Sequence, residues 1–242
     1  MWAADRAVVP LRHILARMGK DVSTASFTRE QRQLYREKVR AGLDVFERML
    51  QHSQFEFDRQ MTGMEIELNL VDTYYHPKMD NAEVLVAIQN PEFQTELARF
   101  NIEFNVSPRP LPGTAALDLE ADLRTSLNEA EQRSREVGSH IVMIGILPTI
   151  MPEHFEGDWM SANTRYQALN DAVLAARGED IYLDIEGSSG ERVDRYADSL
   201  APESACTSMQ LHLQVEPQHF AAHWNAAQVL AGPQLAIGAN SP

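Results

Sequence analysis

Three short segments in which polar and apolar residues alternate strictly constrain this chain more than any other feature of its sequence. They span residues 63–72, 101–107 and 208–216. An apolar side chain at every second position is the period of a half-buried β-strand. We therefore expect three strands of one mainly antiparallel sheet, with their polar positions on one surface. That surface would carry four titratable side chains: Glu65, Glu67, Glu103 and His212.

Helical periodicity accounts for much of the remaining chain. It predicts helices over five ranges, namely 29–54, 92–99, 114–137, 164–177 and 218–230. A continuous apolar run over 141–147 indicates a buried strand, and the polar stretch 178–204 is typical of an exposed connection. Together these elements predict an α+β fold in which helices flank the sheet.

Charge and composition exclude several classes of protein. The chain has 242 residues and a formal net charge of −14, so it offers no general electrostatic surface for nucleic acid or for an anionic membrane. No apolar run approaches the roughly 18 residues of a membrane span. Cys206 is the one cysteine and cannot form an internal disulfide. A reducing compartment follows, and we expect a cytoplasmic protein without nucleic-acid or membrane partners.

The crowded carboxylates suggest a chemistry. Three carboxylates on one surface repel one another and stay ionised together only when cations intervene. Such hard oxygen donors suit Mg²⁺ or Mn²⁺, and Mg²⁺ keeps waters that phosphate oxygens can replace, which points to nucleotides. The alternative is a sheet with one solvated polar face, where alternate glutamates need no ligand. On the pattern alone the two interpretations weigh evenly.

The two ends of the sequence carry their own expectations. Residues 1–17 mix arginines with short apolar stretches, so they form an N-terminal extension, either a start placed upstream of Met18 or a targeting segment. The last five residues, 238–242, end in an Asn-Ser-Pro turn signal that another segment normally follows. We expect 18–242 to be the N-terminal part of a longer catalytic domain.

An ordered series of short motifs resembles the glutamate–cysteine ligase family of the bacterial and plant type, including the broader carboxylate–amine ligases. The motifs occupy 63–68, 100–105, 163–166, 206–212 and 238–242. The resemblance implies a glutamine-synthetase-like fold, a curved antiparallel sheet whose concave face holds Mg²⁺ and ATP. It also implies that ATP phosphorylates a glutamate γ-carboxylate, after which an amine such as cysteine displaces phosphate.

The resemblance assigns roles to individual residues. Glu65, Glu67 and Glu103 would bind Mg²⁺, and Glu96, on the predicted helix before Glu103, would be a further ligand. His212 would lie near the metal and the γ-phosphate of ATP.

The remaining matched positions would bind substrates. Arg165 and Tyr166 would serve the amino-acid side of the site, while Asn240 and Ser241 would form a turn near the nucleotide. The alternative to a ligase is a non-catalytic metal- or nucleotide-binding module, or a subunit that needs another chain to complete the site. An open sheet edge also favours a homo-oligomer.

Overall fold

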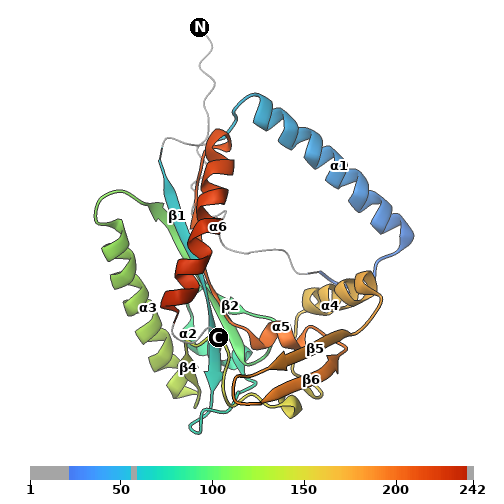
Figure 1. The fold of residues 1–242 in the computed structure, drawn as a ribbon, viewed down its shortest axis with the longest axis vertical. Helices are drawn as coiled ribbons and strands as arrows, with labels where there is room; N and C mark the ends of the chain where they lie inside the picture. The colour runs from blue at the N-terminus through green and yellow to red at the C-terminus, as the bar shows by residue number, and fades with distance from the viewer. Residues whose placement is uncertain (1–21, 56–58, 239–242) are drawn as a thin grey trace.

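The computed structural model describes residues 22–55 and 59–238 (Figure 1). A five-stranded sheet lies at its centre, beside a separate two-stranded hairpin. The strands are β1 (Met61–Val71), β2 (Phe93–Thr95), β3 (Asn101–Pro110), β4 (His140–Val142), β5 (Ile181–Glu186), β6 (Arg192–Ala197) and β7 (Met209–Leu213). The α-helices are α1 (Arg29–Gln51), α2 (Asn81–Ile88), α3 (Ala115–Glu136), α4 (Thr164–Arg177), α5 (Ala201–Ala205) and α6 (Phe220–Ile237).

β1 is the central strand of the large sheet. β3 pairs antiparallel along one of its edges, while β7 and β4 share the other edge, also antiparallel. β2 extends the sheet beyond β3. The three strands predicted from alternation are confirmed, and with them an α+β fold built on an antiparallel sheet with flanking helices.

The register of these strands decides which side chains share a face. Glu67 lies opposite Glu103 on β3, and Gly63 lies opposite His212 on β7. Directly paired residues point to the same side of a sheet, and so do residues two apart on one strand. Glu65, Glu67, Glu103 and His212 therefore lie on one face, as the alternation predicts. This surface is called the acidic face below.

The opposite, apolar face of the sheet packs against α2 and α3. Its buried cluster comprises Met64, Ile66, Leu68, Leu70, Val84, Ile88, Phe93, Ile102, Phe104, Val106, Leu119 and Ala130. α3 agrees with the helix predicted over 114–137 and ends before Gly138, whose φ of 76° is a left-handed conformation that glycine adopts without strain. Lys78 Nζ donates to the carbonyls of Val137 and Gly138 at 3.0 and 2.8 Å, which satisfies that helix end.

A second core covers one end of the acidic face. It is built from the end of β1, the 97–100 segment, α4 and α5, and includes Val71, Leu97, Ala98, Phe100, Leu147, Trp159, Tyr166, Leu200 and Ala201. Beneath it Asn69 and Asn101 are fully buried, and Asn101 Nδ2 donates to Asn69 Oδ1 at 3.0 Å. The second core therefore limits the accessible acidic face to the part of the sheet that carries Glu65, Glu67 and Glu103.

Three predicted elements differ from the structure. The helix expected over 92–99 is wrong: residues 93–95 form β2, because the ring of Phe93 stacks on Phe104 with centroids 4.4 Å apart and draws the segment into the sheet. The strand expected over 141–147 shrinks to β4, and Ile146 is exposed beyond it. The connection expected over 178–204 is exposed only in part: it holds the largely exposed β5–β6 hairpin, but Leu200, Ala201 and Ser204 at and within α5 are buried.

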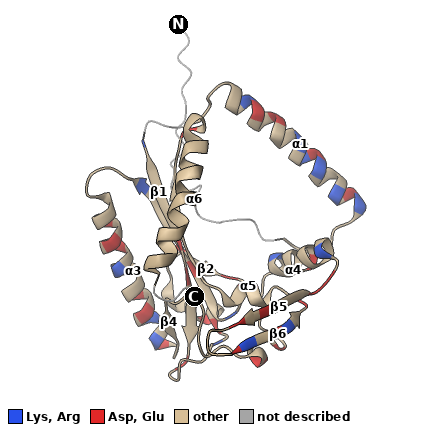
Figure 2. Cartoon of the chain, viewed as in Figure 1, with Lys and Arg blue, Asp and Glu red and all other residues tan. Residues whose placement is uncertain are grey.

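The helices at the two ends of the described chain bury nothing. α1 starts with a capping box between Thr28 and Gln31, and Figure 1 shows it standing away from the sheet. α6 carries no Asp, Glu, Lys or Arg, and Figure 2 shows it uncharged along its length. Neither helix has a buried residue. Within residues 22–55 and 59–238, no helix has the length and apolar character needed to cross a membrane.

Candidate functional site

The acidic face brings together carboxylates from three strands or their ends. Glu65 and Glu67 come from β1, Glu103 from β3, and Glu96 from the residue directly after β2. Glu65 and Glu103 are each 7% exposed, which is unusual for ionisable side chains. Figure 2 shows acidic positions on the central strands. Buried carboxylates of like charge raise the electrostatic cost of the face unless something compensates for it.

Glu103 is held by two side-chain amides. Gln94 Nε2 and Asn105 Nδ2 both donate to Glu103 Oε1, at 2.7 and 2.6 Å. Gln94 lies directly across from Glu103 on β2, and Asn105 is two residues further along β3. Gln94 was not identified from the sequence, because the spacing of residues 92–99 predicts a helix there.

Glu96 lies on the acidic face but not on a helix, which corrects the sequence prediction. β2 ends at Thr95, and the face that carries Gln94 continues to Glu96 two residues later. Burial, followed by the negative charge of Glu103 and then that of Glu67, raises the pKa of Glu96 to about 7 against an opposing hydrogen bond from the backbone of Leu97. Glu96 thus lies close enough to Glu103 and Glu67 for their charges to affect its protonation.

Glu67 is tied to β7. Ser208 donates its backbone N–H to Glu67 Oε2 at 2.7 Å. Burial raises the pKa of Glu67, the hydrogen bonds from Ser208 oppose that shift, and the charges of Glu103 and Glu203 add to it. Glu203, on α5, is a further carboxylate near this face. No local sequence pattern indicates Glu203, because the packing of α5 on the second core brings it close to this face.

His212 borders the acidic face from β7. Its Nε2 lies 3.8 Å from Glu65 Oε1. The imidazole is half-exposed while the Glu65 carboxylate is buried, so His212 reaches this carboxylate from the solvent side.

Tyr166 lies near Glu96, and Arg165 lies against Tyr166. The Tyr166 hydroxyl donates to the carbonyl of Thr95 at 2.6 Å, and Tyr166 is 5% exposed. The Arg165 guanidinium lies over the Tyr166 ring at 5.2 Å. Burial, followed by the charge of Glu96, raises the pKa of the Tyr166 hydroxyl. Of the pair predicted to bind the amino acid, Tyr166 therefore adjoins the carboxylates, and Arg165 contacts Tyr166. The predicted nucleotide-binding pair, Asn240 and Ser241, lies outside the described residues.

The donor set fits a hard divalent cation chemically. All the clustered donors are carboxylate oxygens, which Mg²⁺ and Mn²⁺ prefer. Burial, with the charges of neighbouring carboxylates adding to it, raises the pKa of Glu67 and of Glu96. In the part of the chain that the structure describes, no three His, Cys, Asp or Glu side chains are already arranged around one metal position. The carboxylates converge without being closed into a coordination sphere.

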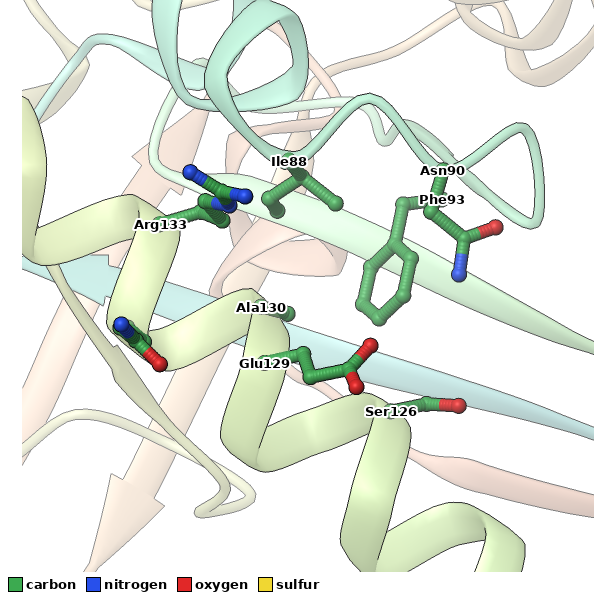
Figure 3. Close-up of a pocket in the computed structure, with 8 residues that line it drawn as sticks. Ile88, Asn90, Phe93, Ser126, Glu129, Ala130 and Arg133 are labelled. Carbon is green, nitrogen blue, oxygen red and sulfur yellow. The ribbon is translucent and has the colours of Figure 1, made fainter.

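Two cavities lie on the other side of the sheet. One, of about 400 Å³, lies between α3 and the end of α2 with β2 (Figure 3), and is lined by Ile88, Asn90, Phe93, Ser126, Glu129, Ala130, Gln132 and Arg133. The other, of about 260 Å³, adjoins it through Ser126. Phe93 and Phe104 belong to the apolar face, so neither cavity contains a carboxylate of the acidic face.

Comparison with known proteins assigns the sequence to a family. The family described as glutamate-cysteine ligase family 2 (GCS2) matches residues 61–242. This range includes β1, the whole acidic face and every element after it. No curated protein matches the chain. Because the match covers most of the sequence, including each predicted site residue, the chain belongs to glutamate–cysteine ligase family 2.

Proposed function

We propose that this protein is an ATP- and Mg²⁺-dependent carboxylate–amine ligase that joins the γ-carboxylate of glutamate to an amine, most simply that of cysteine. The observation that carries the proposal is the convergence of Glu65, Glu67, Glu96 and Glu103 on one largely buried face. Membership of the ligase family supports it. The antiparallel sheet is compatible with a glutamine-synthetase-like fold, in which this face would be the catalytic one.

The proposed reaction has two steps that balance. A γ-carboxylate oxygen of glutamate attacks the γ-phosphorus of ATP, and the bond to the β–γ bridging oxygen breaks, releasing ADP. The amine nitrogen then attacks the acyl carbon of the γ-glutamyl phosphate, inorganic phosphate leaves, and the nitrogen loses a proton to solvent. Phosphoryl transfer depends mainly on positioning and on neutralising charge, which an acidic protein must obtain from cations.

The residues of the acidic face would divide this work. Glu65, Glu67, Glu103 and Glu96 would hold Mg²⁺ or Mn²⁺. When bound, the cation supplies positive charge to the phosphate oxygens of ATP. His212, half-exposed beside Glu65, would donate a hydrogen bond to a phosphate oxygen.

The residues proposed to bind the substrates are assigned from their positions in the chain and in the fold. Arg165 carries a fixed positive charge over the ring of Tyr166 and would suit the α-carboxylate of glutamate. Tyr166 anchors Thr95 next to Glu96 and so positions the end of β2. Asn240 and Ser241 are proposed near the nucleotide on the resemblance alone.

The test measures ADP release from ATP with glutamate, Mg²⁺ and a panel of amines that includes cysteine. We expect release to require glutamate and Mg²⁺ together, and hydroxylamine to trap the activated glutamate as a hydroxamate. ATP binding that needs Mg²⁺ but yields no ADP would instead identify a non-catalytic nucleotide-binding module. Absence of both binding and turnover would overturn the proposal.

A further inference from the structure

The two amides that hold Glu103 act on one oxygen of its carboxylate. Gln94 Nε2 at 2.7 Å and Asn105 Nδ2 at 2.6 Å share Oε1. A carboxylate oxygen has two lone pairs, so two donors saturate Oε1 and leave Oε2 as the oxygen that neither amide holds. Hydrogen bonds to an ionised acceptor are short and strong, as these are.

The strand register dictates this arrangement. Gln94 pairs directly with Glu103 across β2 and β3, and Asn105 follows Glu103 by one pleat on the same strand. Glu67 pairs with Glu103 from the other side, across β1 and β3. Glu103 is therefore flanked by an amide on one neighbouring strand and by a carboxylate on the other.

The chemical type of the two donors is informative. A lysine or arginine at either position would neutralise Glu103 and compete with a cation for its oxygens. A side-chain amide orients the carboxylate but leaves its negative charge intact. Partners that orient a ligand in this way typically account for about 10–100-fold in metal affinity.

We infer that Gln94 and Asn105 are positioning residues that hold Glu103 Oε1 and thereby present Oε2 to the divalent cation. This inference rests on the proposed function, because it requires the acidic face to bind a metal. Their role is to orient Glu103, on which both amides act directly.

The test substitutes each amide by an apolar side chain of similar size, Gln94→Met and Asn105→Leu. Gln132→Met serves as the control, since Gln132 is exposed on α3 and far from the acidic face. Free Mn²⁺ is titrated with the metal-free protein and followed by electron paramagnetic resonance, and the melting temperature is measured in EDTA.

We expect Gln94→Met and Asn105→Leu to weaken Mn²⁺ binding by about 10–100-fold, with Gln132→Met unchanged. The Mg²⁺ concentration needed for half-maximal turnover rises by a similar factor, while kcat at saturating Mg²⁺ stays close to that of the parent. A general structural defect would instead lower kcat and the melting temperature in EDTA together.

The contrary outcomes are distinct. Unchanged Mn²⁺ affinity in both variants overturns the inference while leaving the proposed function standing, and an effect in only one assigns the role to that residue alone. Unfolding of both variants also overturns it, because the amides would then be structural. A parent protein that binds no Mn²⁺ contradicts the proposed function itself.

Discussion

The backbone N–H of Ser208 donates to Glu67 Oε2 at 2.7 Å across 141 residues of sequence. In the same place Glu67 donates its own N–H to the carbonyl of Ser208 at 2.9 Å. Glu67 thus fastens the start of β7 to β1 with both its backbone and its carboxylate. This double tie separates Glu67 from Glu65, whose carboxylate lies beside an imidazole instead.

Loss of either β1 carboxylate is expected to abolish catalysis without unfolding the protein. Glu65→Gln and Glu67→Gln each remove one negative charge and relieve repulsion on the acidic face. We expect turnover to fall at least about 100-fold. Loss of a residue that only orients a metal ligand already costs up to about 100-fold in metal affinity or activity, and loss of a ligand itself should cost more. The free energy of unfolding changes by no more than about 1 kcal/mol in the metal-free protein. ADP release and urea unfolding measure the two effects.

Glu67→Ala adds a stability cost that Glu67→Gln avoids, because the amide oxygen of Gln still accepts from Ser208. We expect the alanine variant to be about 1–2 kcal/mol less stable than the glutamine variant. Glu129→Gln, exposed on α3, is the control for a neutralised glutamate. Normal turnover of Glu65→Gln or Glu67→Gln at saturating Mg²⁺ would show that the residue is not a ligand.

The raised pKa of Glu96 predicts how the free energy of unfolding depends on pH. Its pKa in the folded protein is raised from 4.5 to about 7, mainly by burial and by the charge of Glu103. Between these values the folded state binds more protons than the unfolded state, so its stabilising contribution is complete below pH 4.5 and is lost as pH rises through 7. The loss is on the order of 3 kcal/mol.

Urea unfolding in EDTA between pH 5 and 8 measures this dependence. Glu96→Gln should flatten most of it, whereas Glu129→Gln should leave it in place. The contribution of Glu67, whose pKa burial raises in the same direction, remains in both variants. A Glu96→Gln protein that lost stability with pH as steeply as the parent would contradict the assignment.

The sheet and its acidic face were predictable from sequence because both depend on a local period of two. Alternation alone indicated β1, β3 and β7, and their pairing follows from the need to bury one apolar face. Periodicity likewise predicted a helix from residue 29, where α1 begins.

What sequence missed depends on contacts between distant residues. Residues 92–99 look helical by spacing, yet Phe93 stacks on Phe104 and forces an edge strand, which puts Gln94 and Glu96 on the acidic face. The tilted ring pair of Tyr182 and Tyr196 stabilises the β5–β6 hairpin. No local sequence pattern predicted this hairpin. Glu203 comes near Glu67 only through the packing of α5.

Tyr166→Phe tests the link between α4 and the end of β2. The variant removes the hydroxyl that donates to the Thr95 carbonyl at 2.6 Å and leaves that carbonyl without this donor. We expect a loss of about 1–2 kcal/mol in the free energy of unfolding. Tyr182→Phe loses an exposed hydrogen bond to Asp194 at 3.0 Å and should change stability by less than about 0.5 kcal/mol. Equal effects of the two substitutions would show that the Thr95 contact is not stabilising.

The exposed apolar surface of β7 and α6 predicts self-association. Met209, Leu211 and Leu213 on β7 are 53–64% exposed, on the side of the sheet that elsewhere is buried by α2 and α3. Trp224 and Leu230 on α6 are each 57% exposed, and the helix has no Asp, Glu, Lys or Arg to keep it in water. Exposed apolar surface of this extent favours association, and a specific dimer needs roughly 1,000 Å² of buried area.

Sedimentation velocity over a tenfold range of protein concentration should show a reversible dimer. Leu211→Lys and Leu230→Lys should shift the equilibrium to monomer. Val86→Lys should not, because Val86 is a single exposed apolar residue on α2. A monomer at every concentration would mean that this surface is tolerated in water.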